Sequence, residues 1–250
     1  MSGHSKWSSI KHKKGAADAK RGKIFTKHAK LIAINARHGA DPGTNPGLRA
    51  AIDSAKADNV PNANIDRAVK KGSGQDKDAA VYEEIFYEGF GPAGTSLYIQ
   101  ALTDNKNRTS SDIKSILSRR GGGMGATGSA TWIFERKGLI MVPLESGSDA
   151  DNVELAAIDA GASNIIREGS HLEVHTHASE LAKVGDALKG TGIAIESAAI
   201  TYIPKQTVKI TNEEAARKVL GAIEALEEND DIAEVYCNFD MDEELMKKVV

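Results

Sequence analysis

Apolar positions recur at helical spacing near the start of the chain. From Gly15 to Arg37, a period of 3.6 residues separates the two faces of one helix. The apolar face collects Ile24, Phe25, Ala29, Leu31, Ile32 and Ala36. The opposite face collects Lys20, Lys23, Lys27, Lys30 and Arg37, with Ile34 as an apolar exception. The pattern predicts an amphipathic helix that packs by one side and presents positive charge on the other.

Two shorter amphipathic segments follow this helix. Asn45-Pro46 suits the opening of a second helix, since proline fits the first helical turn, and the apolar face is Leu48, Ala51, Ile52 and Ala55. A third helix after Pro61 carries Ile65, Ala68 and Val69 and ends at Lys70-Lys71-Gly72. Three consecutive amphipathic helices predict a small bundle, and the polar run 72–78 reads as a linker.

After residue 80 the pattern becomes mixed. Strands are expected at 82–88, 95–103, 129–136, 139–143, 164–168, 171–177, 193–202, 206–210 and 232–238. Helices are expected at 109–120, 150–161, 178–189 and 212–228. The order from 139 to 202 is β-α-β-β-α-β, which is typical of a ferredoxin-like domain.

The element order predicts an α+β protein with an N-terminal three-helix domain and two ferredoxin-like α/β domains, one inserted in the other. The basic arm and helical domain would take residues 1–80. The discontinuous α/β domain would take 81–137 and 204–250, and the inserted ferredoxin-like domain would take 138–203.

Composition excludes several classes of protein. The 250 residues are 40% hydrophobic, which suffices for packed cores, and the single cysteine, Cys237, rules out a disulfide framework and Cys-based zinc motifs. No apolar run approaches the ~20 residues of a membrane helix. The Met-Ser start has no apolar segment, so neither a secretory signal nor myristoylation is expected. We therefore expect a cytoplasmic protein.

Charge is divided unevenly along the chain, although the formal net charge is only −3. Residues 1–80 hold 16 Lys+Arg and 7 Asp+Glu, a net charge of +9, whereas residues 81–250 carry a net charge of −12. Such an asymmetry indicates an anionic partner for the basic end, either nucleic acid or a membrane surface, unless the segment is simply a solvated tail.

The residues before the first helix are polar, basic and without period, so 1–14 is interpreted as an arm. Trp7, His12 and Phe25 lie among the lysines, and an exposed aromatic ring can stack on an unpaired base. Phe25 fits the helix core better than a ligand site. A membrane surface is disfavoured, because the bundle needs the few large apolar residues of this helix.

A second basic segment, 104–109, connects an expected strand to an expected helix. Lys106 and Arg108 near a helix N-terminus could bind phosphate, and Thr109 or Ser110 would cap that helix. An ordinary polar turn remains the alternative.

Other patterns point to no enzyme. The run 121–125 is glycine-rich but lacks the lysine and Ser/Thr of a phosphate-binding loop, so it is interpreted as a flexible loop after Arg119-Arg120. Alternation in 171–177 places His171, Glu173, His175 and His177 on one strand face, which favours a solvated face over a zinc site. The acidic residues in 212–244 suit a solvated helix surface and its turn.

Five spaced motifs resemble the YebC family. They are Gly3–Lys27, Asn45–Ile52 (Asn-Pro-Gly-Leu-Arg-Ala-Ala-Ile), Tyr87–Pro92 (Tyr-Glu-Gly-Phe-Gly-Pro), Leu102–Thr109 (Leu-Thr-Asp-Asn-Lys-Asn-Arg-Thr) and Phe134–Gly138 (Phe-Glu-Arg-Lys-Gly). The likeness runs nearly from end to end, but between 144 and 200 it rests on element order. Gly122-Gly123-Met124-Gly125 departs from the family's more usual Gly-Gly-Asn-Leu-Gly.

The resemblance implies a three-domain protein without enzymatic activity or cofactor. Family members are described as cytoplasmic, probable transcriptional regulators that bind DNA, and others, including a mitochondrial translational activator, as ribosome-associated factors that relieve stalling, for example at proline runs. The matching positions here are Lys6, Lys11, Lys13, Lys14, Lys20, Arg21, Lys23, Lys27, Asn105, Asn107 and Arg108.

Three hypotheses follow for the function. The chain is expected to be a non-enzymatic nucleic-acid-binding regulator of gene expression at promoters, a translation factor that binds ribosomal RNA, or a protein scaffold whose basic arm meets acidic partners. The predicted nucleic-acid contacts are Lys6, Trp7, Lys11, His12, Lys13, Lys14, Lys20, Arg21, Lys23, Lys27, Lys30, Asn105, Lys106, Asn107 and Arg108. No catalytic residue, metal, cofactor or membrane partner is expected.

Overall fold

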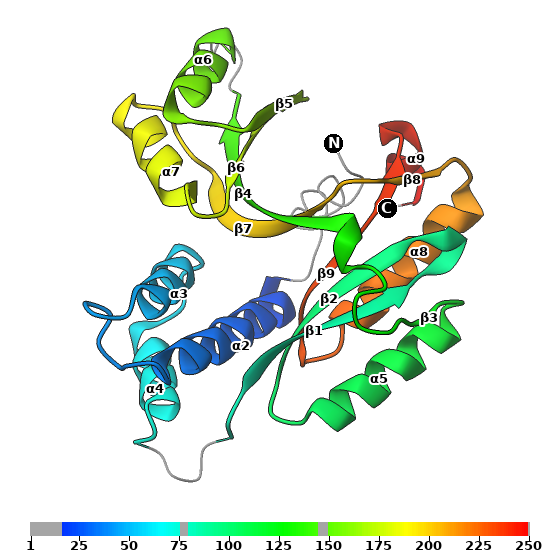
Figure 1. Ribbon diagram of the computed structural model, residues 1–250, viewed down its shortest axis with the longest axis horizontal. Helices are drawn as coiled ribbons and strands as arrows, with labels where there is room; N and C mark the ends of the chain where they lie inside the picture. The colour runs from blue at the N-terminus through cyan, green and yellow to red at the C-terminus, as the bar shows by residue number, and fades with distance from the viewer. Residues whose placement is uncertain (1–16, 76–79, 145–149, 250) are drawn as a thin grey trace.

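A computed structural model describes residues 17–75, 80–144 and 150–249 of the chain (Figure 1). The predicted arm, 1–14, lies outside the described residues. The fold class is α+β, as predicted: a helical domain, a central α/β domain and a ferredoxin-like α/β domain inserted in it.

The helical domain contains α2 (Ala17–Ala36), α3 (Pro46–Ala57) and α4 (Asn62–Gly72). Asn45 caps α3, because its side chain accepts a hydrogen bond from the backbone N–H of Leu48. Gly72 brings α4 against α2 so closely that a Cβ would lie 2.1 Å from the carbonyl oxygen of Ala33. The apolar faces meet in one core of Ile32, Ala36, Leu48, Ile52, Ala55, Val60, Ile65 and Ala68.

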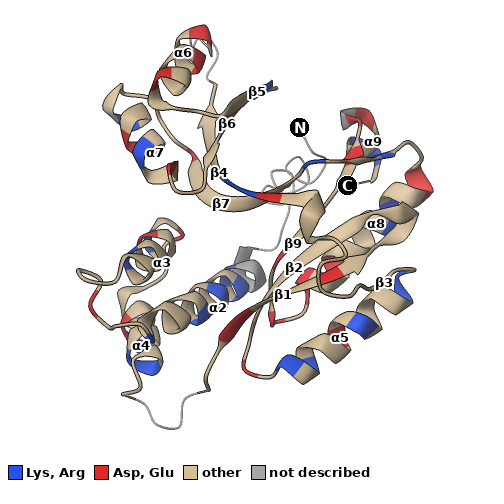
Figure 2. Cartoon of the chain, viewed as in Figure 1, with Lys and Arg blue, Asp and Glu red and all other residues tan. Residues whose placement is uncertain are grey.

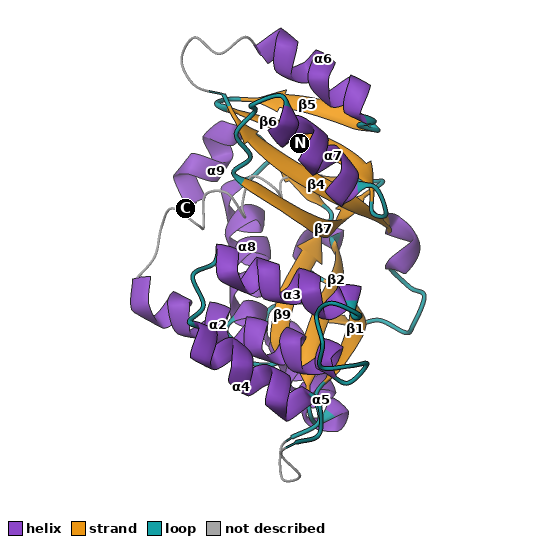
Figure 3. Cartoon of the chain, turned by 90° about the vertical axis from the view of Figure 1, so that its left-hand side faces the viewer, coloured by secondary structure: helices purple, strands orange, loops and turns teal. Residues whose placement is uncertain are grey.

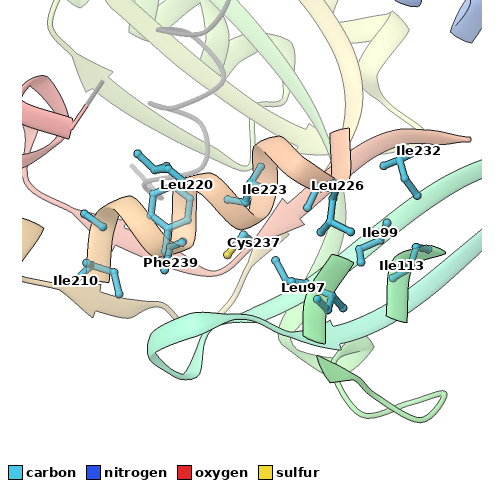
Figure 4. Packing of buried hydrophobic residues seen from close by; sticks show 14 of the residues in the cluster. Leu97, Ile99, Ile113, Ile210, Leu220, Ile223, Leu226, Ile232, Cys237 and Phe239 are labelled. Atoms are coloured by element: carbon cyan, nitrogen blue, oxygen red, sulfur yellow. The ribbon is translucent and has the colours of Figure 1, made fainter. Parts of the chain in front are cut away.

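The central domain is built on a sheet in the order β3-β1-β2-β9. Its strands are β1 (Glu83–Phe90), β2 (Ser96–Thr103), β3 (Gly123–Met124) and β9 (Ile232–Cys237). Two helices pack on one face, α5 (Lys106–Arg119) and α8 (Glu213–Glu227), and their apolar side chains close the core with Leu97, Ile99 and Phe239 (Figure 4). A parallel pair, β8 (Val208–Ile210) and β10 (Phe239–Met241), and α9 (Glu243–Val249) complete the domain.

The inserted domain contains β4 (Phe134–Pro143), α6 (Ala150–Ala160), β5 (Asn164–Glu168), β6 (His171–His177), α7 (Leu181–Gly190) and β7 (Ser197–Pro204). Its antiparallel sheet has the order β5-β6-β4-β7, which is the ferredoxin-like arrangement. Both helices pack on one face of this sheet (Figures 1 and 3). The other face is turned toward the β8 and α9 end of the central domain (Figure 1).

An aromatic cluster joins the two sheets. Tyr202 of β7 lies edge-on to Tyr98 of β2, with ring centroids 5.0 Å apart, and Phe86 stacks on Tyr98 at 4.8 Å. Burial, together with Tyr202, raises the pKa of Tyr98 to about 12. These contacts hold the inserted sheet in a defined position over the central sheet.

Several boundaries differ from the predictions. The end of the expected strand 129–136 joins the expected strand 139–143 in the single strand β4, because Gly138 continues the ladder and leaves room for Thr176 on β6. Residues 129–133 lie outside β4, and Thr131–Ile133 form a short 3-10 helix instead. The run 121–125 is no free loop, since Gly123 and Met124 pair with β1 as β3. The strand expected at 193–202 begins at Ser197, and β10 and α9 carried too short a pattern to be predicted.

Candidate nucleic-acid interface

Several lysines on the basic face of α2 contact the central domain, although only Lys30 among them is buried. The ammonium group of Lys23 donates to the backbone oxygen of Glu228 at 2.8 Å, just beyond the end of α8. Lys27 forms a salt bridge of 2.8 Å with Glu234 on β9. Figure 2 shows the lysines of α2 on the side that faces the acidic start of β1. The lysine face of α2 is therefore largely a contact between domains.

Asp231 is the centre of this contact. Its side chain is only 9% exposed, and Lys30, equally buried, reaches one carboxylate oxygen at 3.1 Å. Arg108 donates to the other oxygen at 2.7 Å, and Thr109 donates to it at 2.9 Å. Lys30 also donates to the backbone oxygen of Asp230 at 2.7 Å. Asp231 thus joins the two basic groups that the sequence offered as separate phosphate contacts.

The segment 104–109 begins α5 earlier than predicted. Asn105, not Thr109 or Ser110, is the N-cap, because its side chain accepts a hydrogen bond from the backbone N–H of Arg108 at 3.1 Å. Lys106 forms a 2.7 Å ion pair with Glu83. The Asp231 carboxylate occupies the position beside Arg108 and Thr109 at which the sequence predicts a possible phosphate contact.

The charges at this contact stabilise one another. Burial alone would raise the pKa of Asp231, but hydrogen bonds from Arg108, Thr109 and Lys30 outweigh it and hold the pKa below its usual range. Burial likewise opposes the charge of Lys27, yet the Glu234 carboxylate raises the pKa of Lys27 overall. Hydrogen bonds to Asp231 raise the pKa of Arg108 as well. Each group keeps its charge because its partner is charged.

The other predicted residues fall into three groups. The side chains of Lys6, Trp7, Lys11, His12, Lys13, Lys14 and Lys20 lie outside what the structure describes. Arg21 and Asn107 are exposed. Phe25 packs against the helical core, as the apolar pattern of α2 predicts.

A second basic face, on α4, was not selected from the sequence. Arg67, Lys70 and Lys71 share a helical face through the i, i+3, i+4 spacing and are all exposed. Within the described ranges, none of the three side chains has an acidic side chain within 4.0 Å. Ile65 and Ala68 on the opposite face enter the core. The same periodicity that identified the α2 lysines could have found this set.

Two other predictions for polar clusters were wrong only in part. In the middle of β6, Glu173 and His175 are buried, with side chains only 2% and 7% exposed, whereas His177 at the end of the same strand face is exposed as expected. Of the acidic residues in 212–244, Glu213, Glu214, Glu228 and Asp230 are exposed as expected, whereas Asp231 is buried in the contact between domains. Among the residues that the structure covers, no group of three or more His, Cys, Asp or Glu side chains could hold a metal ion, and no helix is long and apolar enough to cross a bilayer.

The chain matches two family models over most of its length. Residues 5–75 match the TACO1/YebC protein N-terminal domain, and residues 82–239 match the TACO1/YebC second and third domain. A probable transcriptional regulatory protein of Geobacter sp. (strain M21) is 48% identical over the whole of both chains. A protein of the same description from Thermosipho melanesiensis is 48% identical over all of this chain and 98% of the relative.

A solved structure has the same fold. The crystal structure of a conserved hypothetical protein, Aq1575, from Aquifex aeolicus superposes with a TM-score of 0.83 and 42% sequence identity. The match covers 94% of this chain and 96% of the other. The arrangement of three domains described above is therefore found in a relative as well.

Proposed function

The chain belongs to the TACO1/YebC family, whose similar members are named as regulatory proteins, and from this premise we propose that it is a non-enzymatic regulator of gene expression that binds nucleic acid through its helical domain. The observation that carries the proposal is the exposed basic face of α4, formed by Arg67, Lys70 and Lys71. It belongs to the segment whose net charge is +9, and exposed cations bind phosphates by releasing counterions.

The contact residues are divided between two roles. Lys23, Lys27 and Lys30 fix α2 to the central domain, and Arg108 takes part in the same contact. The α4 face, Arg21 and the basic residues before α2 contact the phosphates. The central and inserted domains repel phosphate, so the nucleic acid approaches from the helical domain alone.

The nucleic acid is duplex DNA at promoters or structured ribosomal RNA, with a cytoplasmic location in either case. The names of the relatives favour DNA. The distribution of charge favours RNA in a ribosome, because an acidic body beside a basic domain fits a surface on which RNA alternates with basic proteins.

Salt-dependent binding tests the proposal. We expect the triple variant Arg67→Ala/Lys70→Ala/Lys71→Ala to bind duplex DNA or ribosomes more weakly, with a slope of log affinity against log salt that is about 2–3 smaller. The matched control Lys114→Ala/Lys183→Ala/Lys189→Ala removes the same charge from exposed positions in the other domains, and it should bind like the unaltered chain.

Co-sedimentation with ribosomes, beside titration of duplex DNA, distinguishes the two targets. If the α4 variant and its control lose the same affinity, net charge alone explains binding and the proposed surface is wrong. Affinity that does not change with salt for either target contradicts the phosphate contacts altogether.

A further inference from the structure

A polar cavity lies between the open face of the inserted sheet and the central domain. Its volume is about 300 Å³, which is at the lower end of the range for small-ligand sites. One side of the cavity is lined by residues of β4, β5, β6 and β7. The other side is lined by β10 and by the segment that follows β7. The helices α6 and α7 pack on the opposite face of this sheet, so they leave the cavity open (Figure 1).

Glu173 of β6 enters this cavity with an unsatisfied oxygen. Its side chain is 2% exposed, and the oxygen Oε1 has no hydrogen-bond partner among the residues that the structure describes. The other oxygen, Oε2, lies 3.3 Å from Nε2 of His175, which is a long contact. A buried carboxylate with an unused oxygen is costly, because water that would solvate it has been removed.

The charges around the cavity favour a cationic occupant. Three carboxylates line it, Glu135, Glu173 and Asp240, against two lysines, Lys137 and Lys205. Lys137 lies 3.4 Å from Glu135, so that pair neutralises itself. The formal charge of the lining, counted without the imidazole, is −1 and is balanced by one monovalent cation.

We propose that this cavity binds a guanidinium group, held by Glu173. A guanidinium is planar and can donate to both oxygens of one carboxylate, and it is less strongly hydrated than an ammonium group, so less is lost when it enters a buried site. The group belongs either to an arginine side chain of a partner protein or to a free guanidinium compound. The proposal is independent of nucleic-acid binding, since the cavity lies in the inserted and central domains.

Calorimetric titration of the full-length chain tests this site. The probes are three capped tripeptides that differ only at the middle residue, which is arginine, lysine or citrulline. Citrulline keeps the planar shape of arginine without its charge. We expect the arginine peptide to bind best and the citrulline peptide to bind about tenfold or more weakly, since a charged hydrogen bond is lost.

Two variants assign the binding to Glu173. Glu173→Gln removes the charge with little change in shape, and binding of the arginine peptide should fall about tenfold or more. Glu196→Gln is the matched control, because Glu196 lies beside the same sheet but is 55% exposed and paired with His171, and it should bind like the unaltered chain. Thermal unfolding of each variant verifies its fold. If Glu173→Gln does not fold, Asp240→Asn is used in its place, and the arginine peptide should again bind more weakly than to the unaltered chain.

The binding results distinguish a partner protein from a free compound as the source of the guanidinium group, and they can also contradict the site itself. Tighter binding of the arginine peptide than of free arginine identifies a protein partner, and equal binding identifies a free compound. Equal binding of the arginine and citrulline peptides, or unchanged binding of the arginine peptide by Glu173→Gln, overturns the proposal. None of these readouts involves nucleic acid, so failure here leaves the role of α4 unaffected.

Discussion

The basic faces of α2 and α4 have similar charge and spacing but different surroundings. Lys23, Lys27 and Lys30 follow the period of α2 and meet the α8–β9 turn and β9, where each ammonium group finds an oxygen acceptor. Arg67 and Lys70 follow the period of α4 and are exposed. Charge counted along the sequence therefore cannot distinguish a contact between domains from a surface that binds phosphate.

The largest effect is expected where the α2 face is most deeply buried. Asp231→Asn leaves the buried ammonium group of Lys30 without a counter-charge, so unfolding in urea should show a loss of about 3–5 kcal/mol. The control Asp230→Asn changes an exposed neighbour whose backbone oxygen, not its side chain, accepts from Lys30, and it should cost little.

A second substitution identifies the cause of that loss. Lys30→Met in the Asp231→Asn background removes the uncompensated charge, so part of the stability should return. If the double variant is as unstable as the sum of the single variants, Lys30 and Asp231 are not coupled. The contact between domains would then rest on Arg108 and the apolar residues around it.

The stability that Asp231 contributes should also depend on acid. Its pKa is lowered in the folded protein, so the carboxylate stabilises the fold above its ordinary pKa of 3.8, and that stability is lost as the pH falls through the folded-state pKa. Unfolding free energies measured from about pH 6 downward to about pH 2 should therefore converge for the unaltered chain and Asp231→Asn, and the convergence should begin below about pH 4. A constant difference across that range would show that the charge of Asp231 is not the cause, and that the amide group facing the donors Lys30 and Arg108 costs the stability at every pH.

A smaller effect is expected at the rim of the same contact. Lys27 and Glu234 are 33% and 31% exposed, and a double-mutant cycle with Lys27→Met and Glu234→Gln should give a coupling of about 0.2–1 kcal/mol. Added salt should reduce this coupling, since dissolved ions screen exposed charges. A coupling free energy as large as that of Lys30 with Asp231 would mean that the exposed edge of the contact contributes as much stability as its buried centre.

The sequence predicted the elements of this fold better than their partners. Leu48, Ile52 and Ala55 lie one helical turn apart and do form the core of the bundle, because periodicity reports which side chains share a face. It does not report what covers that face. Asp231 meets Lys30 across 201 positions of the sequence, a contact that no local pattern encodes.

The inserted domain shows the same limit. Alternation along β6 placed Glu173 and His175 on one face, and they do share it. The expectation of a solvated face failed at these two residues because the chain returns to the central domain after Pro204 and brings residues such as Asp240 to the opposite side of the cavity. Only the three-dimensional arrangement reveals a buried carboxylate there.

The smallest effect on stability is expected for substitutions on the exposed basic face of α4. Arg67→Ala/Lys70→Ala/Lys71→Ala removes three exposed cations from the helix surface, and alanine favours the helix, so the unfolding free energy should change by no more than about 0.5 kcal/mol per site. Denaturant unfolding beside the salt-dependent binding titration checks this. Affinity should fall while stability stays, which is the reverse of the expectation for Asp231→Asn. A loss of stability comparable to that variant would mean that the α4 face also holds the domains together, and the distinction between the two basic faces would disappear.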